Sequence, residues 1–361
     1  MTTDTSTTEA FAGRLFGSAL GAIDLYAVYL GDRLGLYRAL AKDGPATAPE
    51  LAARAGIHPR YAREWLEQQA VSEVLHVDDA AKPEDARRYS LPAAHAEALT
   101  DPESPFSMAP LARAFASIGT VLPKLMEAYR TGGGVAWADY GADGIEAQGD
   151  FNRPWLVGQF GTEYLPSVAD VHARLQADPP ARVADVACGV GWAAIAIARA
   201  YPKAKVDGFD LDASSIALAR KHAADAGIAE RVTFETRDAG DAALQGAYDL
   251  AVVIEAIHDL SRPVEALSAI RKMLAPGGTA IIADERVADQ FTVPGDPVER
   301  LLYGASIFLC LPAGMAEQPS AATGTVMRAG TLRAYAADAG FHQVDVLDIE
   351  HPFLRFYRLT P

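Results

Sequence analysis

A ten-residue segment, ValAlaAspValAlaCysGlyValGlyTrp at 183–192, constrains the fold of this chain more than any other segment. Its first residues are mostly apolar and indicate a buried strand, whereas Gly189 and Gly191 indicate a tight turn that opens a helix. Glycines at such a turn let the backbone approach a ligand closely, and the helix N-terminus that follows favours electron-rich groups. The segment therefore predicts a strand–turn–helix unit that binds a ligand.

The chain after this segment alternates short apolar runs with helical patterns, which is typical of βαβ units in a parallel, doubly wound sheet. The predicted strands are 182–187, 205–210, 231–235, 248–254, 278–284, 341–347 and 352–358. The predicted helices are 191–200, 213–226, 261–274, 296–311 and 329–339. The gap between the last two strands is only 348–351, which permits a hairpin and not a crossover, so the last strand is expected to run antiparallel.

The first hundred residues predict a mainly α-helical domain. An apolar stripe along 11–40 indicates one long helix, and shorter helices are expected at about 47–56 and 58–71. Two short runs, 75–77 and 88–91, can pair across a polar loop, which completes the pattern of a winged helix. We predict this domain at 1–103, a helical roof over the ligand pocket at 104–178 and the sheet-containing core at 179–361.

Charge argues against a nucleic-acid partner. The formal net charge is −15, and the first hundred residues hold ten Lys and Arg against fourteen Asp and Glu. In the third helix, Arg60 and Arg63 are offset by Glu64 and Glu67, whereas phosphate binding needs unopposed basic side chains. DNA is therefore not expected as a partner. The apolar stripe on the first helix instead predicts a homodimer, because a monomer would expose it.

Localisation is expected to be cytoplasmic. Two cysteines are too few for a disulfide framework or a four-cysteine zinc site, and no metal site is predicted. The N-terminus lacks the basic-then-apolar order of a signal peptide. The longest uncharged stretch, 301–316, is too short to span a bilayer and is broken by glycines and a proline, so no membrane contact is expected.

An acidic residue follows the second predicted strand at the position of a ribose ligand. Asp210 lies nineteen residues after Gly191, where a carboxylate can accept hydrogen bonds from both ribose hydroxyls, which implies an adenosine-containing cofactor. The segment 189–194 also fits the G-x-G-x-x-A pattern of an NAD site. Two further acids favour a different cofactor: Asp185 lies inside the first strand, and Asp238 at the end of the third can accept from an adenine amino group.

Together these motifs resemble the class I S-adenosylmethionine-dependent methyltransferases, and more narrowly the small-molecule O-methyltransferases with an N-terminal winged-helix dimerisation domain. The chain is also similar to bacterial winged-helix methyltransferases. The resemblance implies a Rossmann-like, doubly wound, mostly parallel seven-stranded sheet, S-adenosylmethionine as cofactor and S-adenosylhomocysteine as product. Ala187 stands where the family's first glycine usually lies. The cofactor-binding residues that the resemblance implies are Asp185, Gly189, Gly191, Asp210, Leu211, Asp238 and Ala239.

The same resemblance implies catalytic residues after the fourth and fifth strands. His258, followed by Asp259, matches the family's His-Asp pair, in which the histidine is the general base; Glu285 matches a glutamate that orients it. A histidine suits removal of a phenolic proton near neutral pH. Two positions depart from the family. Ile254 stands where plant members have a cofactor-contacting lysine, so a different set of contacts to the methionine end of the cofactor is expected. Val326 stands where the family has a second glutamate, and this departure leaves N-, C- and S-methylation open.

The expected substrate is a small-molecule acceptor, most simply a hydroxyl of an aromatic or polyketide-like compound. The side chains expected around it are Phe160, Tyr164, Trp192, Asp259 and Met315. Two alternatives remain. The chain could be a winged-helix transcriptional regulator that senses a ligand with a methyltransferase fold, or it could bind the cofactor and have lost methyl transfer.

Overall fold

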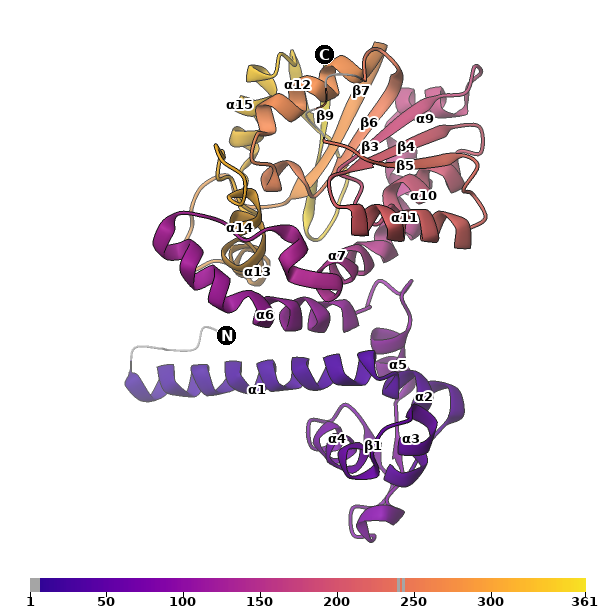
Figure 1. Cartoon of the computed structure of the whole chain (residues 1–361), viewed down its shortest axis with the longest axis vertical. Helices are drawn as coiled ribbons and strands as arrows, with labels where there is room; N and C mark the ends of the chain where they lie inside the picture. The colour runs from indigo at the N-terminus through magenta and orange to yellow at the C-terminus, as the bar shows by residue number, and fades with distance from the viewer. Residues whose placement is uncertain (1–6, 239–240, 242–243) are drawn as a thin grey trace. The chain divides into compact units, whose positions relative to one another are not determined.

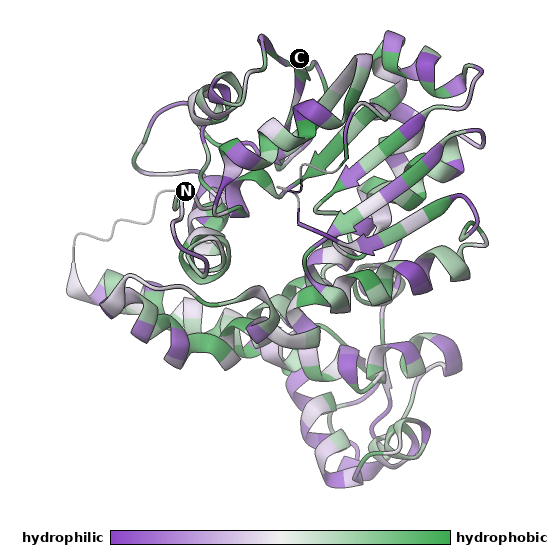
Figure 2. Ribbon diagram, turned by 45° about the horizontal axis from the view of Figure 1, so that its top comes forward, coloured by the Kyte–Doolittle hydropathy of each residue, from purple (hydrophilic) through white to green (hydrophobic). Residues whose placement is uncertain are grey.

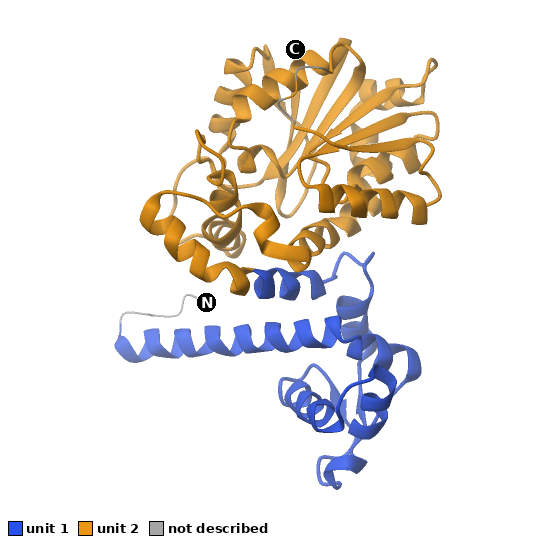
Figure 3. Ribbon diagram, in the orientation of Figure 1, with its two compact units in different colours: residues 1–117 blue, residues 118–361 orange. Residues whose placement is uncertain are grey.

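The computed structural model describes residues 7–238, 241 and 244–361. It divides into two compact units, Met1–Ser117 and Ile118–Pro361, drawn in blue and orange in Figure 3. Domain limits after residues 103 and 178 are expected from the sequence, and these limits stay predictions.

The first unit is a winged helix preceded by a long helix (Figure 1). Its elements are α1 (Thr8–Arg33), α2 (Leu36–Asp43), α3 (Ala48–Ala55), α4 (Pro59–Val71), β1 (His76–Val77), η1 (Glu84–Ala86), β2 (Tyr89–Ser90) and α5 (Ala93–Thr100). Strands β1 and β2 pair antiparallel and form the predicted wing. The prediction of one helix over 11–40 is wrong. The helix is interrupted at Gly35, whose φ of +71° is a left-handed conformation that glycine adopts without steric cost.

Helix α1 carries large apolar side chains that its own unit leaves exposed, among them Phe16 and Leu20. Among the described residues it is also the one helix long and apolar enough to cross a membrane, judged by length and composition. The winged helix has a separate core, in which the rings of Tyr37 and Trp65 meet edge to face at 5.1 Å.

The second unit begins with helices and continues into a seven-stranded sheet. The helical part comprises α6 (Ala109–Thr131), which starts in the first unit, η2 (Trp137–Tyr140), α7 (Gly141–Trp155), the π-helical η3 (Leu156–Tyr164), α8 (Leu165–Ser167) and α9 (Ala169–Gln176). The sheet has the order β5-β4-β3-β6-β7-β9-β8. Its strands are β3 (Arg182–Val186), β4 (Lys205–Asp210), β5 (Val232–Thr236), β6 (Tyr248–Ile254), β7 (Leu274–Glu285), β8 (Gln343–Val346) and β9 (Leu354–Thr360).

The sheet confirms the predicted fold class. Strands β3 to β7 pair parallel, and β9 runs antiparallel to both of its neighbours, as the short gap before it requires. Neighbouring residues of one strand face opposite sides, so Val252 belongs to the core on one face and Val253 to the core on the other. Strands buried on both faces need hydrophobic residues along most of their length, and Figure 2 shows such residues in green along the strands.

Helices on both faces cover the sheet. The remaining helices of this unit are α10 (Trp192–Ala200), α11 (Ala213–Asp225), η4 (Ile257–Asp259), α12 (Pro263–Met273), α13 (Pro297–Ala305), η5 (Ser306–Cys310), α14 (Leu311–Gly314) and α15 (Ala329–Asp338). Side chains of α10 join one core, and those of α12 and α15 join the other. The helix predicted at 296–311 is present, but a π-helical turn, 306–310, interrupts its C-terminal part.

Candidate functional site

The candidate site lies at the carboxyl edge of the sheet, where open α/β folds bind ligands. Strands β4, β3, β6 and β7 are parallel neighbours, so the loops that follow them meet at this edge (Figure 1). Ile254, the last residue of β6, pairs with Ala283, which lies just before the end of β7. The sequence-predicted residues after these strands are therefore brought to one edge.

The glycine loop after β3 has three left-handed residues: Ala187, Gly189 and Gly191, with φ of +55°, +52° and +86°. At Gly191 a Cβ atom would lie 2.7 Å from the ring of Phe234 and 2.9 Å from the Cβ of Ala219, so only glycine fits. Ala187 adopts a conformation that favours glycine, at the position where the family usually has one. The turn therefore keeps its shape despite the substitution.

Asp210, at the end of β4, is tied to this loop. Its Oδ2 accepts a hydrogen bond from the backbone N of Gly189 at 2.8 Å, and its Oδ1 accepts from the N of Asp212 at 2.9 Å. Burial raises the pKa of Asp210. The carboxylate and the glycine loop are thus one structural unit.

Asp185 lies beneath the loop. It is 1% exposed, and its Oδ2 accepts from the backbone N of Ala194 in α10 at 2.9 Å. Burial raises the pKa of Asp185 to about 7. This hydrogen bond joins the carboxyl group of Asp185 to the first turn of α10. Asp185 therefore supports the glycine loop between β3 and α10.

The remaining predicted cofactor residues lie in more open surroundings. Leu211, directly after the half-buried Asp210, is 55% exposed. Asp238 is about half exposed, and its Oδ2 lies 3.9 Å from Nη2 of Arg262. Ala239 lies outside the described residues.

The predicted base, His258, is surrounded by carboxyl groups. Its Nδ1 lies 2.7 Å from Oδ1 of Asp284 and 2.9 Å from Oε2 of Glu285, and its Nε2 lies 3.2 Å from Oδ1 of Asp259. His258 and Asp284 are each 1% exposed, and Glu285 is 7% exposed. The structure therefore brings His258, Asp259 and Glu285 together as predicted, and it adds Asp284, which the sequence analysis missed.

The three buried titratable groups of this cluster, His258, Asp284 and Glu285, have pKa values shifted in different directions. Burial lowers the pKa of His258, but Asp284, Glu285 and Asp259 together raise it well above its usual value. Burial raises the pKa of Asp284, yet the charge of His258 brings it below its usual value. Burial raises the pKa of Glu285 well above its usual value. Asp284 is therefore the ionised partner that accepts a hydrogen bond from Nδ1–H of His258. The raised pKa favours the protonated ring, and Nε2 can take up a proton only after His258 has become neutral.

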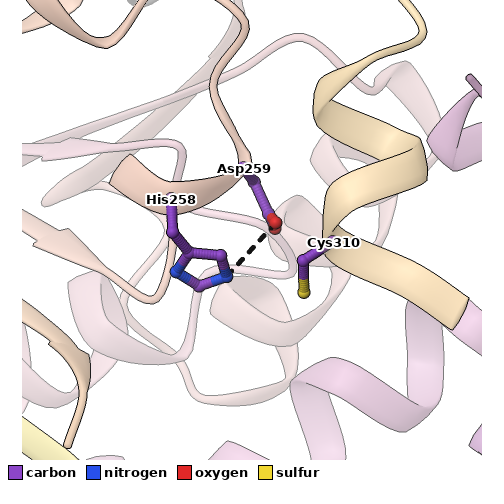
Figure 4. A group of neighbouring side chains, drawn as sticks. All are labelled: His258, Asp259 and Cys310. Atoms are coloured by element: carbon purple, nitrogen blue, oxygen red, sulfur yellow. Dashed lines mark ion pairs between the residues drawn. The ribbon is translucent and has the colours of Figure 1, made fainter. Parts of the chain in front are cut away.

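Cys310 completes the surroundings of Nε2. Figure 4 shows the thiol at the end of η5 and the carboxylate of Asp259 on the same side of the imidazole. Ligand atoms of these three side chains all lie within 4.8 Å of one another. Burial raises the pKa of Cys310 to about 12.

Glu255 is a second acid that sequence reasoning missed. It directly follows β6, has a left-handed φ of +51°, and accepts hydrogen bonds from Gln148 at 2.8 Å and from Asn152, both on α7. Burial raises its pKa to about 7. Acids with a strained backbone and a perturbed pKa, such as Glu255, are concentrated at functional sites.

The side chains expected around the acceptor differ in exposure. Phe160 is fully buried and packs against Trp155, with ring centroids 5.9 Å apart. Tyr164 is half-buried, as is Met315 at the end of α14. Trp192 stacks on His222 at 4.3 Å, with the guanidinium of Arg153 on its ring. Core packing already accounts for Phe160.

The missed residues had partial signals. Asp284 and Glu285 are consecutive acids at the end of an apolar strand, and Glu255 occupies the corresponding place after β6. An acid that follows a buried strand at the carboxyl edge is a candidate on that ground alone. Cys310 had no such signal, because more than fifty residues separate it from His258 and only the folded helix brings them together.

Comparisons with known proteins agree with this architecture. Residues 177–305 match a family described as a methyltransferase domain, and residues 22–101 match the Rv2258c-like winged HTH domain. A ubiquinone biosynthesis O-methyltransferase of Pectobacterium carotovorum is 35% identical over 97 residues, which are 27% of this chain and 40% of that protein. The chain thus spans less than half the length of this curated relative.

Solved structures share the fold over almost the whole chain. The mitomycin 7-O-methyltransferase MmcR is 20% identical with a TM-score of 0.68, and the alignment covers 99% of this chain and 100% of that one. Human N-acetylserotonin methyltransferase in complex with SAM is 18% identical with a TM-score of 0.66, covering 99% of each chain. These likenesses show a Rossmann-like methyltransferase fold together with its N-terminal domain.

Proposed function

We propose that this chain, which combines an Rv2258c-like winged HTH domain with a methyltransferase domain, is an S-adenosylmethionine-dependent methyltransferase of a small-molecule acceptor. One observation carries the proposal. The glycine loop with its tied carboxylate, Asp210, and a buried histidine with an ionised partner, His258 and Asp284, lie at the same edge of the sheet.

The cofactor residues fit an adenosine moiety. Asp210 is placed to accept from ribose hydroxyls, because the backbone of Gly189 and Asp212 fixes its orientation. Exposed Leu211 offers an apolar surface to an adenine ring, and Asp238 an acceptor to its amino group. Gly191 allows the cofactor to approach the backbone closely, and Asp185 supports the glycine loop. Ala239 is proposed as a further contact to the cofactor. A ubiquinone biosynthesis O-methyltransferase that resembles part of this chain, and a methyltransferase of the same fold solved in complex with SAM, support this choice of cofactor.

The proposed chemistry needs one proton transfer. Bound S-adenosylmethionine supplies a methyl group already activated by its sulfonium. Nε2 of His258 accepts the proton of the acceptor hydroxyl as the oxygen–carbon bond forms and the carbon–sulfur bond breaks, leaving S-adenosylhomocysteine. Asp284 holds the ring through Nδ1 and stabilises the imidazolium, and Glu285, at 2.9 Å, assists in positioning.

The proposed acceptor is a hydroxyl of an aromatic or polyketide-like compound. Tyr164, Trp192 and Met315 are the proposed walls of its pocket, and Asp259 beside Nε2 is placed to orient its hydroxyl. Phe160 is left out of this pocket because it lies wholly in the core.

The regulator alternative is not favoured. Arginines of the winged helix are paired within it: Arg60 with Glu64, Arg63 with Glu84, and Arg87 with Glu67 at 2.7 Å. Guanidinium groups engaged in this way are poor phosphate ligands. We propose that this domain instead serves a homodimer, in which a second copy covers the apolar face of α1, and that the protein works in the cytoplasm.

The test is incubation with S-adenosylmethionine labelled on its methyl group and a panel of phenols, amines and thiols. Label on a phenol is expected, and His258→Ala should reduce its transfer by about 10²- to 10⁴-fold while S-adenosylhomocysteine still binds. Cofactor binding with no transfer to any acceptor of the panel would instead favour loss of transfer. Transfer within a few fold of the parent in His258→Ala would refute the role of the base.

A further inference from the structure

Three metal-binding side chains of different chemistry converge beside the proposed base. Nε2 of His258, Oδ1 of Asp259 and Sγ of Cys310 lie within 4.8 Å of one another (Figure 4). Zn²⁺ prefers ligand distances of about 2.0–2.3 Å to nitrogen, oxygen and sulfur, which spaces ligand atoms about 3–4 Å apart. The closest pair, Nε2 and Oδ1, is already at 3.2 Å, so small side-chain rotations complete such a set.

Backbone packing holds the three ligands in place. His258 and Asp259 lie on the short helix η4, whose His258 carbonyl accepts from the N of Gly324 at 3.1 Å. A Cβ atom at Gly314 would lie 2.9 Å from the carbonyl O of Asp259, so glycine lets α14 approach this turn closely. Cys310 ends the π-helical turn just before α14, and such turns are frequent at functional sites.

Two further observations point to a cation. The Asp259 side chain is partly exposed, but its Oδ1 atom is buried. This atom lies 3.2 Å from Nε2 of His258 and accepts no well-aligned hydrogen bond from the described residues, although a buried carboxylate oxygen normally has such a partner. Nδ1 of His258 is held by Asp284 at 2.7 Å, which presents Nε2 outward, as in the carboxylate–histidine–metal arrangement of protein zinc sites.

We propose that His258, Asp259 and Cys310 bind Zn²⁺ or a similar soft divalent cation, and that the bound ion blocks proton abstraction by His258. Nitrogen, oxygen and sulfur together select zinc or cobalt over magnesium and calcium. The ion takes the lone pair of Nε2 that the base needs, and binding releases the thiol proton of Cys310 to solvent. The inhibitory consequence rests on the proposed function, whereas the binding itself does not.

Cobalt provides the direct test, because a thiolate ligand to Co²⁺ gives a near-ultraviolet charge-transfer band. The protein titrated with Co²⁺ is expected to show this band, and Cys310→Ser to lack it. The chain has only two cysteines, so Cys188→Ser is the matched control and should keep the band. Absence of the band in the parent protein, or its loss in Cys188→Ser with retention in Cys310→Ser, would overturn the proposal.

Affinity separates the roles of the other side chains. Asp259→Asn should weaken Zn²⁺ binding, measured by calorimetry, by about 10-fold or more, and Asp284→Asn should weaken it by about 10- to 100-fold through the orientation of His258. Unchanged affinity in Asp259→Asn contradicts the ligand set. Circular dichroism and S-adenosylhomocysteine binding show that each variant is folded. Zn²⁺ should inhibit label transfer by the parent protein more strongly than by Cys310→Ser; equal inhibition would refute the block at this site.

Discussion

Nδ1 of His258 lies 2.7 Å from Oδ1 of Asp284, and both side chains are 1% exposed. The pair joins the loop after β6 to the end of β7. It sets which ring nitrogen carries the proton and, together with Glu285 and Asp259, raises the pKa of the histidine well above its usual value despite burial.

The pH dependence of methyl transfer should report this pair. A base acts only in its deprotonated form, so activity should rise with pH as His258 loses its proton. Asp284→Asn removes a negative charge that raises the pKa of His258, so the rising limb of the profile should move to lower pH. The maximal rate should also fall, because the imidazole ring is less well oriented. Profiles of kcat/KM against pH for parent and variant measure the shift. A limb that stays in place would mean that another group controls it.

Cofactor affinity should depend on Asp210. In Asp210→Ala the proposed ribose contacts are lost, and the backbone N–H groups of Gly189 and Asp212 lose their partner. Charged hydrogen bonds of this kind contribute about 1.5–3 kcal/mol, so S-adenosylhomocysteine should bind about 10- to 150-fold more weakly by calorimetry. Asp225→Ala, which removes an exposed acid paired with Lys221, is the control and should bind like the parent. Equal affinities in all three proteins would refute the assignment.

Stability should depend on the glycine of the cofactor loop. Gly191→Ala places a Cβ atom 2.7 Å from Phe234 at a φ of +86° and should lower the free energy of unfolding by about 1–3 kcal/mol or more. Gly330→Ala is the matched control, because nothing lies within 4 Å of its Cβ position in helix α15. It should be neutral or stabilising by up to about 1 kcal/mol. Urea unfolding compares the two, and an equal loss in both variants would contradict the steric argument.

The oligomeric state should depend on α1. Phe16 and Leu20 are 68% and 48% exposed in the single chain, so a second copy is expected to cover them. Replacing both with glutamate should convert a dimer into a monomer in sedimentation equilibrium. Val71→Glu alters an exposed apolar residue of α4, 84% exposed, and should leave the dimer intact. A monomeric parent protein at micromolar concentration would refute the dimer.

Local patterns were enough to predict most of the fold. The alternation of apolar runs and helices identified all seven strands of the large sheet, and the short gap at 348–351 required the antiparallel last strand. Gly35 shows the limit of such patterns: the apolar stripe runs past it, but its left-handed conformation ends the helix. Periodicity reports which face is buried and not where the backbone turns.

The sequence by itself determined the doubly wound sheet, the glycine loop and the acid at the end of β4, because these depend on residues close together in the chain. Only the tertiary structure decided that Asp284 is the ionised partner of His258, that Glu255 is held by α7, and that Cys310 lies beside Nε2. These contacts join segments far apart in sequence. Their protonation states follow from burial and neighbouring charge, which exist only once the chain has folded.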